Sequence, residues 1–398
     1  MNTLKSMRLH IGIFGKTNVG KSSILNRITN QQTSIVSELA GTTTDVVEKS
    51  MELLPIGSIN LLDTAGIDDE TLLAKERIEK SLNVLTRTDV AILVCDYNGL
   101  NKFDKTLIEK FKELHIPYII VVNKTDIEKP TNETIKELEQ YCNYVIQTSA
   151  TKDEELVYKF KEAMVKLLPE DFVNSPQIAG DLVDKKSTVI MVIPIDKEAP
   201  KGRIILPQVQ TLRDLLDNNC ITLCVKESEL QQAIENLKEP PALVITDSQA
   251  FKNVSQIVPE HIPLTSFSIL FARLKGDLNS FINGAKAIDD LKDGDKVLIL
   301  ESCTHHAIDD DIGRVKIPNL LRKKTGKNLV IENFSGHDFP QISGYNLIIH
   351  CGACMTNRKE VLSRILIASQ QGIPITNYGI TISYCLGILD RATKIFKN

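Results

Sequence analysis

The sequence predicts an α/β protein built of three domains. The chain has 398 residues, which is too long for one hydrophobic core. Short apolar segments alternate with amphipathic ones over most of its length, as in domains that cover a sheet with helices. Breaks in this alternation divide the chain into a first domain at 1–168, a linker at 169–187, and further domains at 188–266 and 267–398.

The first domain alternates apolar strands with helices. The predicted strands are Leu9–Phe14, Ile59–Leu62, Val90–Cys95, Tyr118–Val122 and Tyr144–Gln147, and the predicted helices include Thr71–Leu85 and Asp153–Leu167. The linker that follows contains Pro169, Pro176 and Gly180, which break regular structure. This pattern is typical of a doubly wound sheet.

The second domain is smaller and follows the same alternation. Its predicted strands are Val189–Ile193, Thr222–Val225 and Ala242–Ile245, and its predicted helices are Leu206–Leu216, Glu227–Leu237 and Phe251–Ile257. Pro194 and Asp196 follow its first strand, where a phosphate-binding domain would have a glycine-rich loop. We therefore expect a module without a ligand of its own that serves in oligomerisation.

The third domain carries two cysteine-containing motifs, each just after a predicted strand. Its predicted strands are Lys296–Leu300, Leu329–Glu332 and Asn346–Ile349, and its predicted helices are Leu278–Leu291, Arg358–Gln370 and Ile380–Ile395. The carboxyl ends of strands in open α/β sheets form the edge where ligands bind. The motifs are therefore placed where a bound group is expected.

The composition favours a soluble cytoplasmic protein that does not bind nucleic acid. Hydrophobic residues make up 42% and charged residues 25%, and the net charge is -4, which excludes a strongly basic surface. We find no apolar run of membrane-span length and no secretory signal. The eight cysteines are therefore expected to be reduced, and clustered cysteines in such a protein usually bind metal or act in catalysis.

Four motifs at predicted strand ends indicate a guanine-nucleotide-binding domain. Residues 15–22, GKTNVGKS, match the phosphate-binding P-loop, in which Lys21 reaches the β- and γ-phosphates and Ser22 binds Mg²⁺. Asp63 opens a DTAG motif, where it would hold the magnesium shell and Gly66 would contact the γ-phosphate. Asp126 closes an NKTD motif and can accept two hydrogen bonds that guanine offers and adenine does not. The fourth motif, TSA at residues 148–150, completes the base pocket. The expected nucleotide contacts are Gly15, Asn18, Gly20, Lys21, Ser22, Ser23, Asp63, Gly66, Asn123, Lys124, Asp126, Ser149 and Ala150.

The hydrolytic machinery differs from that of Ras-type enzymes. Ile67 follows Gly66, where Ras-type enzymes have a glutamine that orients water. Asn18, with residues 41–45, GTTTD, resembles the potassium-activated GTPases of the tRNA-modification (TrmE-Era-like) type. That resemblance implies that Asn18 binds K⁺, that Thr43 binds Mg²⁺, and that Asp69 helps to orient water. The expected catalytic residues are thus Lys21, Thr43 and Asp69. Ordinary loop positions remain the alternatives for Asn18 and Asp69.

Residues 303–305, CTH, and 350–354, HCGAC, bring together the ligand types that hold zinc or iron–sulfur clusters. Three thiolates and a histidine fit a structural zinc site, and three thiolates with an open iron position fit an iron–sulfur cluster. The spacing alone does not separate the two metals. We expect the isolated thiols, Cys95, Cys142 and Cys385 and the pair Cys220 and Cys224, to be core residues instead.

The order of these motifs and domains resembles the FeFe-hydrogenase maturation GTPase (HydF) family over nearly the whole chain. The resemblance implies a 4Fe-4S cluster bound by Cys303, Cys351 and Cys354, with His305 and His350 beside the remaining iron. It implies a homodimer formed by the middle domain. It also implies a scaffold or carrier that receives a di-iron subcluster precursor from two radical-SAM maturases and delivers it to apo-hydrogenase. His306, Glu301, Asp309 and Asp310 are further donors near the motif, though loop charges are usually solvated.

Two other functions are compatible with parts of the sequence. A tRNA- or ribosome-associated GTPase with a structural zinc module would need a basic, aromatic-rich face, which a chain of net charge -4 and 5% aromatic residues hardly provides. An electron-transfer enzyme driven by GTP should have a fourth cysteine near the cluster, but Cys385 is the only other cysteine of that domain.

Overall fold

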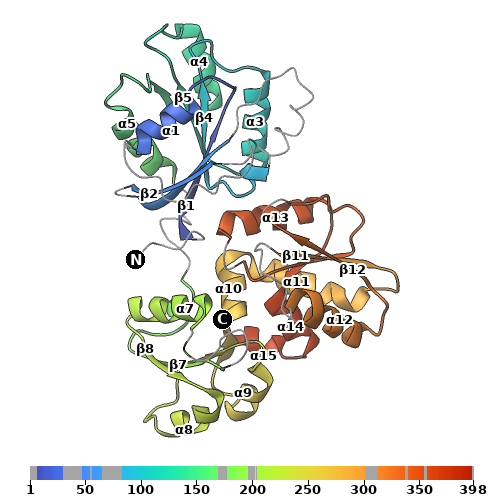
Figure 1. Ribbon diagram of the computed structural model, residues 1–398. Coiled ribbons are helices and arrows are strands. Elements are labelled where there is room, and N and C mark those ends of the chain that lie inside the picture. The colour runs from blue at the N-terminus through green and yellow to red at the C-terminus, as the bar shows by residue number, and fades with distance from the viewer. Residues whose placement is uncertain are drawn as a thin grey trace. The chain divides into compact units, whose positions relative to one another are not determined.

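The computed structural model describes residues 7–29, 47–53, 56–64, 83–168, 177–195, 202, 204–301, 312–336, 339–353 and 356–396. The chain forms two compact units, Met1–Ser175 and Pro176–Asn398. The first unit contains one sheet and the second contains two, and each sheet is packed against helices (Figure 1). The predicted class, an α/β protein of three domains, is confirmed.

The sheet of the first unit has the strand order β2-β3-β1-β4-β5-β6. All its neighbouring strands are parallel except β2 and β3, which form an antiparallel pair. The strands are β1 (Leu9–Phe14), β2 (Val47–Leu53), β3 (Gly57–Asp63), β4 (Val90–Cys95), β5 (Tyr118–Val122) and β6 (Val145–Gln147), and the helices are α1 (Lys21–Thr29), α3 (Lys102–Glu113), α4 (Asn132–Tyr141) and α5 (Leu156–Leu167). Every residue of β1 and β4 is buried, which explains why their sequences are apolar apart from His10.

The polar edge of this sheet was not predicted. Strand β2 reads VEKSMEL and has no apolar run. It lies at the edge of the sheet, where polar side chains are tolerated. Helix α5 begins at Leu156, three residues later than predicted, because the Asp153 carboxylate accepts hydrogen bonds from the Glu155 N–H and the Thr148 hydroxyl. Most of the predicted helix Thr71–Leu85 lies outside the described residues.

The first sheet of the second unit has the order β10-β9-β7-β8, with all strands parallel. Its strands are β7 (Thr188–Val192), β8 (Ile221–Val225), β9 (Leu243–Thr246) and β10 (Leu264–Ser266), and its helices are α7 (Leu206–Asp217), α8 (Leu230–Glu235), α9 (Phe251–Ile257) and α10 (Phe267–Lys275). The edge strand β8 contains no buried residue, whereas the central strands β7 and β9 are almost wholly buried.

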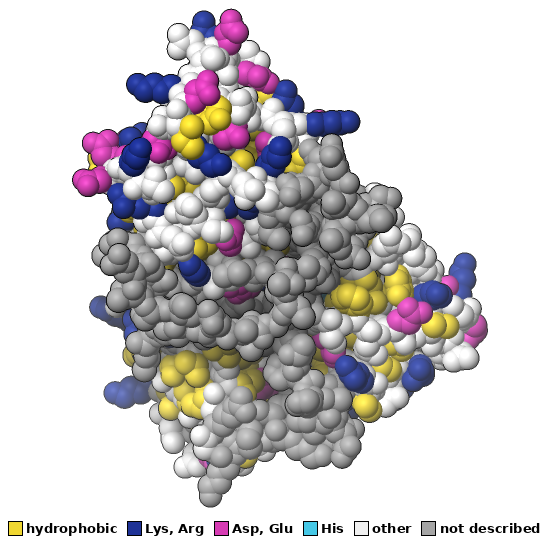
Figure 2. Space-filling model, turned by 45° about the horizontal axis from the view of Figure 1, so that its top comes forward, with side chains coloured by type: hydrophobic (Ala, Val, Ile, Leu, Met, Phe, Trp, Pro, Cys, Tyr) yellow, Lys and Arg dark blue, Asp and Glu magenta, His cyan; other side chains and the backbone are white. Residues whose placement is uncertain are grey.

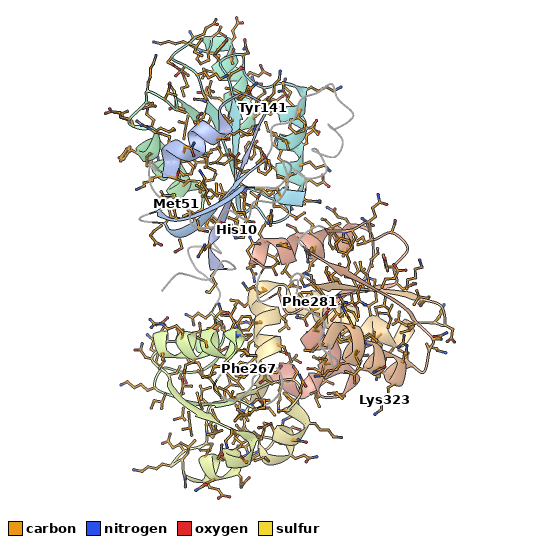
Figure 3. All side chains as sticks on the ribbon, in the orientation of Figure 1. His10, Met51, Tyr141, Phe267, Phe281 and Lys323 are labelled. Atoms are coloured by element: carbon orange, nitrogen blue, oxygen red, sulfur yellow. The ribbon has the colours of Figure 1, made fainter. Side chains whose placement is uncertain are left out.

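The second sheet of this unit has the order β12-β11-β13-β14 and is also parallel. Its strands are β11 (Lys296–Glu301), β12 (Val330–Ser335), β13 (Leu347–His350) and β14 (Ile375–Asn377), and its helices are α11 (Leu278–Lys286), α12 (Ile317–Thr325), α13 (Arg358–Gln370), α14 (Tyr378–Cys385) and α15 (Leu389–Thr393). One hydrophobic core, from Ile190 to Ala392, contains residues of both sheets. Figure 3 labels Phe267 of α10 and Phe281 of α11, which are both fully buried in this unit.

The predicted continuous helix Ile380–Ile395 is wrong, because it is broken between α14 and α15. Gly387 adopts a left-handed conformation with φ +71°. Its N–H bonds the Tyr384 carbonyl at 3.0 Å, and the Ile388 N–H bonds the Ser383 carbonyl at 2.9 Å. These two bonds form a Schellman motif, which ends a helix at a glycine. The apolar periodicity continues across the break and hides it in the sequence.

None of the described helices is both long and apolar enough to cross a bilayer. On the face drawn in Figure 2, Lys and Arg side chains are interspersed with Asp and Glu over the described residues.

Candidate nucleotide and metal-cluster sites

The P-loop, between β1 and α1, requires glycine at two positions. Gly15 has φ +137° and Gly20 has φ +95°, conformations that side chains rarely adopt. A Cβ on Gly15 would lie 2.2 Å from the Val94 carbonyl oxygen, and a Cβ on Gly20 would lie 2.2 Å from Asn123 Nδ2. Asn18 also has a positive φ, of 63°, which asparagine tolerates better than most residues. The loop is thus held close to the end of β4 and to the residue that follows β5.

The residues predicted to hold phosphate and magnesium lie together at the start of α1. Lys21 Nζ donates to the carbonyls of Gly15 and Lys16 at 2.9 Å each, so the side chain folds back along the loop. The Ser22 hydroxyl donates to Asp63 Oδ2 at 2.9 Å. A pair of serine and aspartate oxygens is the donor set that Mg²⁺ prefers beside a nucleotide.

The second oxygen of Asp63 supports the same assignment. Asp63 Oδ1 is buried and makes no hydrogen bond within the described part of the chain. Burial raises the pKa of Asp63, while the Ser22 hydrogen bond and the charge of Lys21 act in the opposite direction. A buried carboxylate oxygen without a donor is costly, and a divalent cation would satisfy it.

The predicted base pocket connects three loops through Asn123. Its Nδ2 donates to the Val19 carbonyl at 2.8 Å, and its Oδ1 accepts from the Ala150 N–H at 2.9 Å. Asp126 lies on the same loop. The hydrogen bond from Ser149, with help from Lys152 and against partial desolvation, holds the pKa of Asp126 below its usual range. Asp126 is therefore an ionised acceptor fixed in place for a ligand that presents two donors.

Three predicted residues of the nucleotide site, Thr43, Gly66 and Asp69, lie outside the described residues. Their roles remain predictions. The described ones, from the P-loop, β3, β5 and β6, lie at the carboxyl edge of the first sheet, where a doubly wound domain binds its ligand.

The strands that lead to the two cysteine motifs are neighbours. Leu300 of β11 pairs with His350 of β13 in parallel register, and the Cys351 N–H donates to the Leu300 carbonyl at 2.8 Å. Cys351 is buried, and Ala353 has φ +54°, which marks a tight turn within the Cys-x-x-Cys segment. The chain from β11 returns at β12 on one side, and the chain from β13 returns at β14 on the other. The motifs therefore flank the topological switch point of this sheet.

Cys303, Cys354 and His305 lie outside the described residues, as do His306, Asp309 and Asp310. Among the residues that the structure does describe, no three His, Cys, Asp or Glu side chains gather in a metal-binding arrangement. The cysteine and histidine set as a whole therefore remains a prediction.

His350 is described, and a buried ion pair faces it. His350 is 0% exposed, and Arg364 and Glu360 of α13 are each 1% exposed. Arg364 Nη1 lies 2.7 Å from His350 Nε2, and Arg364 Nη2 donates to Glu360 Oε1 at 2.6 Å. Sequence analysis missed these two residues. An arginine within the mostly apolar stretch 361–367, four positions after a glutamate that directly precedes this stretch, would have been the available signal.

Glu301, a further predicted donor, is engaged with protein groups. Its carboxylate accepts from the Ser335 hydroxyl at 3.0 Å and from the Tyr378 hydroxyl at 3.3 Å. Arg314 lies 3.7 Å from it. These contacts fix the Glu301 side chain at the end of β11, immediately before the first cysteine motif.

The isolated cysteines mostly follow expectation. Cys95, Cys142 and Cys220 are buried, and burial raises the pKa of Cys95 to about 12, so it stays a neutral thiol in the core. Cys385 is half-buried, and burial raises its pKa to about 11. Cys224 is exposed on β8. The expectation of a core position was wrong for Cys224 because β8 is an edge strand.

Comparison with protein families assigns most of the chain. Residues 178–276 match the hydrogen maturase F dimerization domain, and residues 279–395 match the hydrogen maturase F tetramerization domain. Residues 10–124 match a family described as 50S ribosome-binding GTPase. The chain belongs to the hydrogen maturase F (HydF) family. In HydF terms, the first unit carries the GTPase domain, and the second unit carries the dimerization and tetramerization domains.

Curated relatives that are GTPases match part of the chain. The tRNA modification GTPase MnmE of Thermotoga petrophila is 35% identical over 164 residues, which is 40% of this chain and 36% of that protein. MnmE of Staphylococcus haemolyticus is 40% identical over 146 residues, 36% of this chain and 31% of the relative. The HydF chain thus spans about a third of the length of these relatives.

Solved structures also resemble part of the HydF chain. Era from Aquifex aeolicus bound to GDP and AlF₄⁻ is 21% identical, covers 62% of this chain and 97% of its own, and has a TM-score of 0.34. A probable GTP-binding protein engB is 24% identical, with coverages of 40% and 97% and a TM-score of 0.32.

Proposed function

We propose that this HydF-type protein hydrolyses GTP and acts as the scaffold or carrier in FeFe-hydrogenase maturation. It binds a 4Fe-4S cluster with one exchangeable iron, receives a di-iron subcluster precursor from two radical-SAM maturases, and delivers it to apo-hydrogenase. The observation that carries the proposal is the pairing of β11 with β13. This pairing directs the chain toward both cysteine motifs at one edge of a HydF domain.

The thiolates of Cys303, Cys351 and Cys354 hold the cluster, and the family resemblance puts His305 and His350 beside the remaining iron. Three thiolates satisfy three irons of a cubane and leave the fourth with a weaker ligand. The described residues fit this donor set, because Cys351 is fixed beside the end of β11 and a tight turn follows it. A carrier needs such an open position if its cargo is to attach and leave.

The GTPase domain uses Lys21 for phosphate, with Ser22, Asp63 and Thr43 for Mg²⁺. K⁺ bound by Asn18 supplies positive charge in the transition state, as the likeness to MnmE suggests, and Asp69 orients water. An Asn18→Ala variant is then expected to hydrolyse GTP equally fast in potassium and sodium salts. A preserved preference for potassium would contradict the K⁺ assignment.

The middle domain forms a homodimer through β8. Ile221 and Leu223 of this edge strand are 59% and 36% exposed, and Val209 and Leu216 of the adjacent helix α7 are also exposed. An edge strand with exposed apolar side chains can pair with a strand of another chain. The match to a dimerization domain supports a second copy of this chain as the occupant.

GTP binding changes the contacts with the maturases, and the chemistry that builds the precursor occurs on those enzymes. To test the carrier role, the protein is purified anaerobically from cells that also make both maturases and is then mixed with apo-hydrogenase. Hydrogen evolution should appear with the wild type and be absent with Cys351→Ser, a variant matched in size. If the wild type fails to activate apo-hydrogenase under these conditions, the proposed function is wrong.

A further inference from the structure

Three buried side chains, His350, Arg364 and Glu360, form a chain of contacts next to the second cysteine motif. His350 ends β13, and Glu360 and Arg364 lie one turn apart on α13. The distances are 2.7 Å from His350 Nε2 to Arg364 Nη1 and 2.6 Å from Arg364 Nη2 to Glu360 Oε1. On its other side, His350 Nδ1 lies 2.8 Å from the Cys351 carbonyl oxygen.

The protonation of His350 follows from its two partners. A guanidinium has only donors, so His350 Nε2 must be the acceptor in the contact with Arg364. A carbonyl oxygen has only lone pairs, so Nδ1 must carry the proton that it shares with Cys351. The contacts therefore fit the Nδ1–H tautomer of His350, and both of its nitrogens are engaged.

Arg364 also joins the strand ends on either side of the switch point. Its Nη2 donates to the Gly336 carbonyl at 3.3 Å, just beyond β12, and the Gly336 N–H bonds the Glu301 carbonyl of β11 at 2.8 Å. The Phe339 ring lies 5.8 Å from the guanidinium. One side chain thus connects the segment before Cys303 with the segment before Cys351.

We infer that Arg364, held by Glu360, is a positioning residue that locks His350 as an Nδ1–H imidazole, so that His350 orients the Cys351 loop and ligates no iron. This inference rests on the proposed cluster site and departs from the role that family resemblance gives to His350. Among the two histidines of the motifs, it leaves His305 as the candidate beside the open iron.

Ligation of iron by His350 would require breaking this arrangement. Coordination through Nε2 would displace Arg364 and leave a buried cation short of one acceptor, which is costly. Coordination through Nδ1 would remove the bond that holds the Cys351 carbonyl. Partners of this kind behind a metal site commonly fix a ligand's orientation, and here they act on the backbone that carries a thiolate ligand.

The tautomer is tested on the cluster-free protein. Two-bond ¹⁵N–¹H correlations of ¹⁵N-histidine-labelled protein, recorded above the usual imidazole pKa of about 6.5, distinguish the two tautomers. His350 is assigned by the signal that is lost in His350→Gln, and the exposed His261 gives the reference for a solvated ring. We expect Nδ1–H for His350 and a tautomer mixture in Arg364→Met. An Nε2–H ring in the wild type would overturn the inference.

The cluster-loaded protein gives a second, independent readout. Pulsed electron paramagnetic resonance should show the same nitrogen couplings in the wild type and in His350→Gln, whose amide oxygen can still accept from Arg364. A coupling that disappears in His350→Gln would identify His350 as a ligand and contradict the inference. Release of iron to a chelator should be ~10-fold faster or more in Arg364→Met than in Arg213→Met.

Arg213→Met is the matched control, because Arg213 is exposed and pairs with Asp217 four residues later. Equal iron release from these two variants would show that Arg364 does not position the site. If Arg364→Met does not fold, the tautomer of His350 in the wild type and the nitrogen couplings of His350→Gln still test whether His350 ligates iron. Absence of iron and sulfide in the wild type would instead refute the proposed cluster. The tautomer measurement would still be valid, because it is made on the cluster-free protein.

Discussion

Asp126 is the single residue that we propose to set the choice of nucleotide. The Ser149 hydrogen bond lowers its pKa, so the carboxylate stays ionised above the ordinary aspartate value of about 3.9. Its acceptor role would be lost only as the pH falls through the lowered folded value. Two acceptor lone pairs match the N1–H and the amino group of guanine.

An Asp126→Asn variant should therefore bind GDP more weakly and xanthosine diphosphate more tightly. Because the base would lose two hydrogen bonds to a charged group, GDP affinity should fall by roughly 10²–10⁴-fold. The amide can donate to the xanthine oxygen and accept from its N1–H. Calorimetric titration with both nucleotides measures the change, and an unchanged preference for GDP would place the base elsewhere.

The sequence indicated through local motifs where the candidate nucleotide residues lie in the fold, but it did not indicate the residues that support the Cys351 loop. Gly15, Gly20 and Asn123 belong to local motifs whose backbone geometry is set by a few neighbouring residues. Arg364 and Glu360 act on a strand that is separate from their own helix, and only the packing of α13 against β13 brings them to His350. Their sequence signal is an ion pair in an apolar helix, which does not name its partner.

At the scale of elements, helix α10 is fastened to the segment that follows the Cys-x-x-Cys turn. Lys275 is buried and its Nζ donates to the Thr356 carbonyl at 3.0 Å. Arg358 Nη1 donates to the Leu274 carbonyl at 2.5 Å and lies within 3.3 Å of the Arg273 and Gly276 carbonyl oxygens. Lys275 thus satisfies a carbonyl just before α13, and Arg358 satisfies carbonyls at the end of α10. Both cations lie at the C-terminus of α10, where positive charge is favourable.

Lys275→Met should lower the free energy of unfolding of the second unit by about 1–3 kcal/mol, because the Thr356 carbonyl loses a buried donor. Chemical denaturation followed by a probe in that unit measures the loss. Lys252→Met is the control, since Lys252 is exposed on α9. Equal stability of the two variants would show that this contact does not stabilise the unit.

For the whole molecule, the sequence predicts the three sheets but not how their elements end. Strand Val90–Cys95 and helix Arg358–Gln370 have the predicted bounds. The strand is an apolar run between two aspartates, and the helix lies between its N-cap Asn357 and the helix-ending Gly372. The break at Gly387 is a local glycine motif that the continuing apolar pattern hides. The exposure of β8 depends on its position at the edge of the sheet, which the residue pattern of the strand does not contain.

The edge strand β8 gives a prediction for the assembly. Ile221→Lys combined with Leu223→Lys should weaken self-association ~10-fold or more, because charged side chains would replace apolar surface at the proposed dimer face. Light scattering over a range of concentrations measures the mass. Ile127→Lys, an exposed position of the first unit, serves as the control. Identical masses for the β8 variant and the control would exclude β8 from the interface.

The central claim is that one edge of the last sheet binds an iron–sulfur cluster. Anaerobic iron and sulfide analysis, with an electron paramagnetic resonance spectrum of the reduced protein, tests it most directly. The account predicts iron and sulfide in equal amounts near ~4 per chain, with a signal that disappears in Cys303→Ser, Cys351→Ser or Cys354→Ser. Stoichiometric zinc without sulfide would contradict it and leave a GTPase with a structural zinc module.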